Sequence, residues 1–459
     1  MIEAVLLIDF GSTFTKVTAV DVEARKIIAT AKAPTTVELG IDKGLIEAID
    51  KLEKSAEVKL KYRRKLACSS AAGGLKMVAI GLVPDLTAEA AKTAALGAGA
   101  KLMDVYSYRL NNKELKEITN LNPDIILLAG GTDGGNSEVI VENGKKLAQS
   151  DINCPIIVAG NKDVQDELYE ILSEQNKEFS IIDNVLPSLD KINIEPAREE
   201  IRKVFINNII SAKGFDVIKK EINSIVMPTP EAVLQAGKFI SEHKLLGSEE
   251  LIIVDMGGAT TDVHSFTDGM PNTTGVVYRG LPQPFAKRTV EGDLGMRYSL
   301  CALIEEIGEA KIKKELPDLN LDNIIKNINE DYWNEDVTWE FENYLARHGV
   351  NKAVRRHGGT VETVYTPQGA SYIQTGKDLT NVGVVIGTGG PLVNSSKSGY
   401  ILKGALFNPD EPMVLMPKRC NFSVDRKYVL SSIGLLVDDF PEVAKAIVQD
   451  NFDFIEGGN

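Results

Sequence analysis

Short apolar runs joined by tight turns open the chain. Ala4–Asp9, Phe14–Val20 and Lys26–Ala33 are three such runs, a pattern typical of an antiparallel meander of strands. Ile41–Ser55 then changes to helical spacing of its apolar residues. Asp124–Leu128 is a continuous apolar run that leads into paired glycines. The first part of the chain therefore predicts mixed α/β structure.

The opening pattern returns in the second half of the chain. An apolar run up to Val254 is followed by the turn Asp255-Met256-Gly257-Gly258-Ala259 and a return strand, as at Asp9-Phe10-Gly11-Ser12-Thr13. Ile125–Gly131 lies about as far beyond Asp9 as Val384–Gly390 lies beyond Asp255, and both end in paired glycines. Self-similarity at such a long period predicts two copies of one structural unit.

A chain of 459 residues exceeds what one hydrophobic core usually serves. We expect an α/β fold of two related halves, residues 1–150 and 246–459, which face each other across a cleft. Residues 151–245 look like an added α/β segment with connecting helices. An acidic stretch at about 305–348 has a helical pattern and reads as an insertion in the second half.

Charge and cysteine usage narrow the classes of function. The net charge of -14 argues against a nucleic-acid partner and against an anionic membrane surface. The four cysteines are scattered, with no spacing typical of a metal site. No stretch approaches the length of a spanning helix, and no signal peptide is evident. We therefore expect a cytoplasmic protein that keeps its cysteines reduced.

The two turns have the chemistry of a phosphate site. Glycines let backbone N–H groups approach phosphate oxygens, and hydroxyl side chains add donors. Asp9 and Asp255 would repel a bare triphosphate, so we expect them to hold Mg²⁺ and to be the catalytic carboxylates. Lys16 reaches a phosphate or simply faces solvent, and Asp262 is more consistent with a structural role. The candidate nucleotide-binding residues are Gly11, Ser12, Thr13, Thr15, Lys16, Gly257, Gly258, Thr260, Thr261, Gly387, Thr388, Gly389 and Gly390.

These motifs carry a resemblance to a known superfamily. Asp9–Thr15, Asp255–Asp262 and Gly387–Pro391 look like the two phosphate motifs and the adenosine motif of the actin, heat-shock chaperone and sugar kinase proteins. The resemblance implies two RNase-H-like halves and the cofactors ATP and Mg²⁺. No P-loop motif is present in the sequence.

A narrower resemblance covers nearly the full length. The blocks Cys68–Lys76, Leu128–Asn136, Val254–Asp262 and Val384–Pro391 look like the accessory protein of adenosylcobalamin-dependent glutamate mutase, also called methylaspartate mutase. The resemblance implies an ATPase that reactivates a mutase by releasing damaged cobalamin. The implied partner is glutamate mutase or a related aminomutase. A homo-oligomer is also possible.

Other classes stay open at the level of the sequence. A metabolite kinase needs a further carboxylate as base, for which Asp133 and Asp293 are the candidates. A polymerising actin-like protein has no discriminating feature here. An ATP-driven electron activator needs a cysteine-held cluster, for which the sequence shows no pattern.

Overall fold

Two compact units make up the computed structural model, which describes residues 2–11, 13–36, 40–70, 75–210, 222, 224–329, 339–367 and 369–455. Unit 1 comprises Met1–Ala236, Gly280–Pro284 and Leu430–Ile447, and unit 2 comprises Gly237–Arg279, Phe285–Val429 and Val448–Asn459. The three-part division by residue number that the sequence suggested stays a prediction.

The first sheet of unit 1 has the strand order β10-β4-β1-β2-β3. Its strands are β1 (Ile2–Phe10), β2 (Phe14–Asp21), β3 (Lys26–Pro34), β4 (Leu60–Ser69) and β10 (Ser224–Pro228). β1, β2 and β3 are antiparallel, as predicted, whereas β4 runs parallel to β1 and β10 parallel to β4. Helix α1 (Ile41–Ser55) covers one face and packs Leu45 and Leu52 against Leu6, Ile8 and Val17.

The main sheet of unit 2 repeats this topology. Its order is β14-β12-β11-β17-β18-β19. The strands are β11 (Leu251–Met256), β12 (Thr261–Phe266), β14 (Ala286–Glu291), β17 (Val384–Thr388), β18 (Asn421–Val424) and β19 (Phe454–Ile455). β11, β12 and β14 form the antiparallel part, and β17 and β18 follow in parallel. Two sheets with one strand order confirm the predicted α/β fold class with two RNase-H-like halves.

The sequence matched one pair of strands wrongly. We expected Ile125–Gly131 to correspond to Val384–Gly390, because both are apolar and end in paired glycines. β17 pairs with β11 as β4 pairs with β1, so β4 is its counterpart. β7 (Ile125–Leu128) lies in a different, all-parallel sheet. Both glycine pairs meet a local backbone constraint instead, since Gly131 and Gly389 each have a positive φ.

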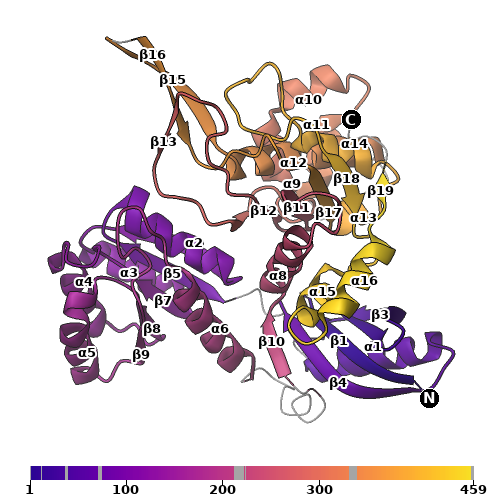
Figure 1. Cartoon of the computed structure of the whole chain (residues 1–459), viewed down its shortest axis with the longest axis horizontal. Coiled ribbons are helices and arrows are strands. Elements are labelled where there is room, and N and C mark those ends of the chain that lie inside the picture. The colour runs from indigo at the N-terminus through magenta and orange to yellow at the C-terminus, as the bar shows by residue number, and fades with distance from the viewer. Residues whose placement is uncertain are drawn as a thin grey trace. The chain divides into compact units, whose positions relative to one another are not determined.

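That parallel sheet is inserted between β4 and β10, and Figure 1 shows it in purple. Its order is β6-β5-β7-β8-β9, a doubly wound arrangement. The strands are β5 (Lys76–Gly81), β6 (Lys101–Ser107), β7, β8 (Ile156–Val158) and β9 (Phe179–Ile181). The helices around it are α2 (Glu89–Gly97), α3 (Asn112–Leu121), α4 (Glu138–Ala148), α5 (Gln165–Glu174) and α6 (Glu195–Ile210), with short turns Pro84–Ala88 and Lys162–Val164. The parallel sheet and its helices run from Lys76 to Ile210.

Helices fill most of the rest of unit 2, and a small third sheet projects from it (Figure 1). The helices are α9 (Leu300–Ile307), α10 (Glu309–Glu315), α11 (Leu321–Asn329), α12 (Trp339–His357), α13 (Gly390–Val393), α14 (Ser398–Leu402) and the turn Lys403–Ala405. The third sheet has the order β13-β16-β15, with β13 (Val276–Arg279), β15 (Thr360–Thr366) and β16 (Gly369–Thr375). Three more helices are α8 (Thr229–Glu242), α15 (Leu430–Leu436) and α16 (Pro441–Asn451).

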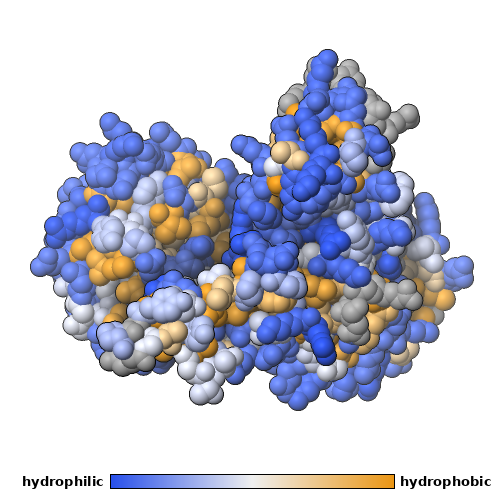
Figure 2. All heavy atoms as spheres, turned by 90° about the horizontal axis from the view of Figure 1, so that it is seen from above, coloured by the Kyte–Doolittle hydropathy of each residue, from blue (hydrophilic) through white to orange (hydrophobic). Residues whose placement is uncertain are grey.

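The surface is largely hydrophilic in the view of Figure 2, with apolar residues in smaller patches. Among the described residues, no helix is both long and apolar enough to cross a membrane. Within the same residues, no group of three or more histidine, cysteine or acidic side chains is arranged to hold a metal ion. Cys68, Cys154, Cys301 and Cys420 form no disulfide bond.

Helix α15 packs against α8 through a glycine, and this contact can be tested. A Cβ atom on Gly434 would lie 1.9 Å from the carbonyl oxygen of Ala232. We expect Gly434→Ala to lower the free energy of unfolding by about 1–3 kcal/mol through overpacking, measured by urea denaturation. Gly292→Ala is the matched control, because a Cβ there meets no atom within 4 Å. Equal stabilities of the two variants would contradict the packing described.

Candidate functional site

Asp9 lies at the carboxyl end of β1 and is held from several elements of unit 1. The hydroxyl of Thr229, at the start of α8, donates to Asp9 Oδ1 at 2.7 Å, and Cys68 Sγ of β4 donates to the same oxygen at 3.6 Å. Ser431 Oγ of α15 donates to Asp9 Oδ2 at 3.4 Å. Lys16 Nζ of β2 lies 3.8 Å from Oδ2. The Asp9 side chain is only 10% exposed, so these contacts fix its orientation.

Strand pairing explains two of these contacts. Asp9 is the register partner of Lys16 in the antiparallel β1–β2 pair and of Cys68 in the parallel β1–β4 pair. Burial, and then the nearby Asp9 carboxylate, raises the pKa of the Cys68 thiol well above its usual value. The thiol therefore stays protonated and acts as a hydrogen-bond donor to Asp9. Sequence analysis had found Cys68 only as part of a resemblance block.

Thr229 and Ser431 were missed by sequence analysis. They are 220 and 422 residues from Asp9 along the chain, so no local pattern joins them to it. The signal available for Thr229 is the Thr-Pro-Glu start of a helix, since threonine before proline is typical of a helix N-terminus. Ser431 gives no comparable signal.

The turn after Asp9 is shaped by its glycine. The N–H of Gly11 donates to the carbonyl oxygen of Phe14 at 3.1 Å, and a Cβ on Gly11 would lie 2.7 Å from that oxygen. Thr35 Oγ1 donates to the carbonyl oxygen of Gly11 at 2.8 Å and lies 3.1 Å from Thr15 Oγ1. Thr15 is fully buried, so its hydroxyl supports the turn, while Thr13 is exposed. Ser12 lies outside the described residues.

The second turn, in unit 2, is built in a related way. The N–H of Gly257 donates to the carbonyl oxygen of Thr260 at 2.8 Å. The carbonyl oxygen of Gly258 accepts from the N–H groups of Arg297 and Tyr298, both at 2.8 Å. Thr261 is fully buried and its hydroxyl donates to the carbonyl oxygen of Leu294 at 2.7 Å. The turn is therefore supported from the segment 294–298, and Thr260 is its partly exposed hydroxyl.

Asp262 is engaged in a buried ion pair. Its Oδ2 accepts from Arg288 Nε at 3.1 Å and from Arg288 Nη2 at 2.7 Å. The two side chains are 12% and 6% exposed. This geometry agrees with the structural role expected for Asp262, because the carboxylate is used to join β12 to β14.

The glycine turn after β17 lies directly beside Asp255. Thr388 is the register partner of Asp255 in the β11–β17 pair. Gly389 has φ of 89°, and a Cβ on it would lie 2.1 Å from the carbonyl oxygen of Met256 and 2.8 Å from Asp255 Oδ1. Only glycine satisfies both constraints. The structure thus brings Asp255, the turn 257–260 and the turn 387–390 together at one sheet edge.

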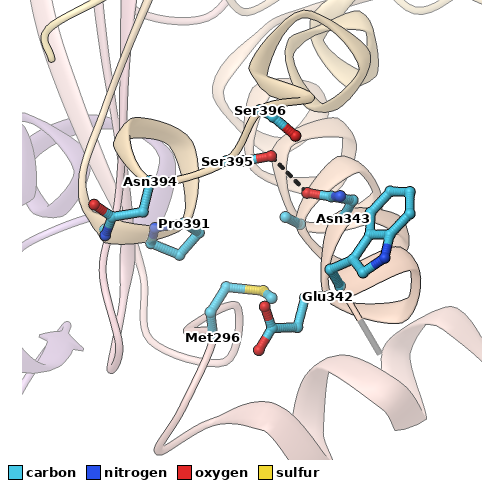
Figure 3. Close-up of a pocket in the computed structure, with 10 residues that line it drawn as sticks. Met296, Glu342, Asn343, Pro391, Asn394, Ser395 and Ser396 are labelled. Carbon is cyan, nitrogen blue, oxygen red and sulfur yellow. Dashed lines mark hydrogen bonds between the residues drawn. The ribbon is translucent and has the colours of Figure 1, made fainter. Parts of the chain in front are cut away.

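A cavity of about 380 Å³ opens next to this edge, within unit 2 (Figure 3). It is lined by Met296, Trp339, Glu342, Asn343, Ala346, Gly390, Pro391, Asn394, Ser395 and Ser396. Ser395 Oγ donates to Asn343 Oδ1 at 2.8 Å across the cavity wall, which ties α12 to the segment after α13. Burial raises the pKa of Glu342. Of the lining residues, only Gly390 was among the candidates from sequence.

The two carboxylates considered as kinase bases are both occupied. Both Asp293 carboxylate oxygens accept from Arg356 Nη1, at 2.8 Å and 2.9 Å, and this hydrogen bonding lowers the pKa of Asp293. Asp133 Oδ1 accepts from the N–H of Lys162 at 3.1 Å and from Asn184 Nδ2 at 2.9 Å, in the inserted parallel sheet. Asp133 therefore shapes the loop after β7 in unit 1.

Comparison with known proteins gives a full-length match. A family model described as MutL protein matches residues 5–452. The chain is 50% identical over 459 residues to Protein MutL of Clostridium tetanomorphum, a match that covers 97% of this chain and 98% of that protein.

Solved structures are far more distant. An ATP-dependent caprolactamase from Pseudomonas jessenii matches with 13% identity and a TM-score of 0.36, covering 95% of this chain and 71% of that one. A gluconate kinase from Lactobacillus acidophilus matches with 9% identity and a TM-score of 0.35, covering 99% and 93%. These superpositions are loose, so the fold assignment rests on strand order.

The ion pair of Asp262 with Arg288 yields a stability prediction. We expect Asp262→Asn to lower the free energy of unfolding by about 3–5 kcal/mol, because it removes the carboxylate charge that pairs with the buried Arg288 guanidinium. Urea denaturation at neutral pH measures the change. Glu362→Gln is the control, since it breaks a solvent-exposed pair with Arg279 and should cost no more than about 1 kcal/mol. An Asp262→Asn protein as stable as this control would rule out the structural role.

Proposed function

Because this chain belongs to the MutL protein family, we propose that it is an ATP-dependent reactivating factor for an adenosylcobalamin-dependent mutase, in the first place glutamate mutase. One observation carries the nucleotide part of the proposal. Two sheets of the same strand order each have an aspartate at the carboxyl end of the first strand, followed by a glycine-containing turn. The mutase part rests on the family and on the four sequence blocks described above.

The residues of unit 2 fit a nucleotide. The backbone of Gly389 lies so close to Asp255 that a Cβ atom on residue 389 would fill the space beside the carboxylate. We assign the backbone of Gly257, Gly258 and Gly390, and the hydroxyl of Thr260, to hydrogen bonding of phosphate oxygens. When bound, Mg²⁺-ATP would supply the phosphoryl group to be hydrolysed and the charge that neutralises it.

The proposal assigns separate roles to the carboxylates of Asp255 and Asp9. Asp255 orients the cation or the attacking water. Asp9, its counterpart in the first sheet of unit 1, is proposed to bind a cation by the same chemistry, and its hydrogen bonds from Thr229 and Ser431 keep it aligned. Lys16 lies close to Asp9, where it offsets the negative charge until a cation is bound.

The cavity beside the 387–390 turn is proposed to take adenine and ribose. Its volume suits a nucleoside, and its wall combines an aromatic ring with amide and hydroxyl groups. Trp339 offers a stacking surface, and the Asn343–Ser395 pair offers donors and acceptors to a purine edge.

A metabolite kinase is the alternative from another class, and the geometry does not favour it. Both candidate bases, Asp133 and Asp293, already accept hydrogen bonds from protein groups. A general base must instead be available to the proton that it removes.

Hydrolysis provides the first test. We expect Asp255→Asn to lower the ATP hydrolysis rate at least about 100-fold while nucleotide binding persists, because the carboxylate acts mainly in the transition state. Phosphate release measures the rate, and isothermal titration calorimetry measures binding. Asp318→Asn, which changes an exposed carboxylate elsewhere in unit 2, is the control and should hydrolyse ATP normally.

Reactivation provides the decisive test with the same proteins. Glutamate mutase blocked with cyanocobalamin is incubated with this chain, ATP, Mg²⁺ and fresh adenosylcobalamin. We expect mutase activity to return with the unchanged chain and with Asp318→Asn, but not with Asp255→Asn. If the unchanged chain restores no mutase activity, the proposed function is wrong.

The cavity gives a separate prediction. We expect Trp339→Ala to weaken ATP binding about 10-fold, because a stacking contact contributes about 0.5–1.5 kcal/mol beyond buried area. Trp339→Phe keeps an aromatic surface and should bind within about threefold of the unchanged protein. Titration with a fluorescent ATP analogue measures both. Identical affinities for the alanine and phenylalanine variants would show that the ring does not touch the base.

A further inference from the structure

The third sheet of unit 2 is an arm with exposed apolar residues. β15 and β16 form a hairpin that projects beyond the rest of the unit, and β13 pairs along the other side of β16 (Figure 1). Tyr365 near its tip is 85% exposed, Val277 60% and Tyr372 44%. A small sheet with open faces gains little from burial, and exposed apolar surface of this kind marks an interaction site.

One face of the arm carries no charged residue. Strand register places alternate residues of the three strands on this face, since successive side chains point to opposite sides. They are Val276, Tyr278, Val361, Thr363, Tyr365, Ala370, Tyr372 and Gln374. On the opposite face, Arg279 and Glu362 form an ion pair of 2.8 Å. The arm strands therefore have no net charge, in a chain whose net charge is -14.

The outer edge of β15 is open over most of its length. The N–H of Val361 points away from β16 and donates to the carbonyl oxygen of Met413 at 2.8 Å. Because backbone groups alternate in direction along a strand, those of Thr363 and Tyr365 also point away from β16. Within the described part of the chain, they form no hydrogen bond beyond the sheet. This edge also lacks the lysine or proline that usually protects an edge strand.

The root of the arm is joined to the candidate nucleotide site through two elements. His357 ends α12 just before β15, and its Nε2 lies 2.7 Å from Ser265 Oγ on β12. Lys377 follows β16, and its Nζ donates to the same Ser265 oxygen at 3.3 Å. β12 begins at the 257–260 turn, and α12 begins at the cavity with Trp339. The root of the arm thus contacts α12 and β12, two elements that also reach the site.

We propose that the open edge of β15 receives an extended segment of another protein, which adds a strand to the arm. Backbone hydrogen bonds to Thr363 and Tyr365 supply the attachment, and the uncharged face supplies apolar contacts. A second copy of this chain is disfavoured as the occupant, because it would bring a further net charge of -14 close by. The occupant is the protein that the ATP site acts upon, so its identification as glutamate mutase rests on the proposed function.

The test removes one outward N–H group from the edge. Thr363→Pro deletes a donor that the β15–β16 ladder does not use, and edge strands tolerate proline. Thr363→Val is the matched control, because it keeps the N–H and the branched shape. Tyr365→Asp is a second variant, at a position too exposed to disturb folding. Binding to cyanocobalamin-loaded glutamate mutase is measured by biolayer interferometry, with basal ATP hydrolysis as the check on folding.

We expect Thr363→Pro and Tyr365→Asp to raise Kd at least about tenfold, and Thr363→Val to stay within about twofold. Basal ATP hydrolysis should be unchanged in all three. Unaltered affinity of the first two variants overturns the proposal, as does absence of binding by the unchanged chain. A dimer in sedimentation that Thr363→Pro dissociates also overturns it, in favour of a second copy. If the variants lose mutase binding but even the unchanged chain does not hydrolyse ATP, the proposed function is contradicted and the docking proposal stands.

Discussion

Parallel pairing of a first strand with a fourth is the constraint on which both sheets depend. It aligns the carboxyl ends of β1 and β4 in one sheet and of β11 and β17 in the other. Asp9 thereby meets Cys68, and Asp255 meets Thr388 and the close turn at Gly389. Strand direction alone brings the polar turns to one edge, because the termini of parallel strands gather there.

The two halves have nevertheless diverged at equivalent places. Lys16 and Asp262 occupy the same register position opposite the two aspartates, but Lys16 lies near Asp9 whereas Asp262 is paired with Arg288. Asp9 is surrounded by hydrogen-bond donors from β4, α8 and α15. In unit 2, the corresponding edge is bordered by a glycine turn and a cavity. One topology therefore supports two different local chemistries.

Helix α12 relates the features of unit 2 to one another. Its first turns line the cavity, and its last residue is hydrogen-bonded at the root of the arm. Arg356, near its end, also pairs with Asp293 and Glu291 at the end of β14. An element that is rigid along its length and contacts both places is suited to pass a change at one of them to the other.

Local sequence determined the meander Ile2–Pro34, the helix Ile41–Ser55 and both aspartate turns, because strand alternation, helical spacing and glycine conformations are short-range properties. It also suggested the duplication, yet it matched Ile125–Gly131 to the wrong strand. Only the tertiary structure decided that β4 is the counterpart of β17, that Thr229 and Ser431 meet Asp9, and that α12 completes the cavity. These contacts join residues far apart along the chain, and pairing between distant strands and helices leaves no periodic signal in the residues that it brings together.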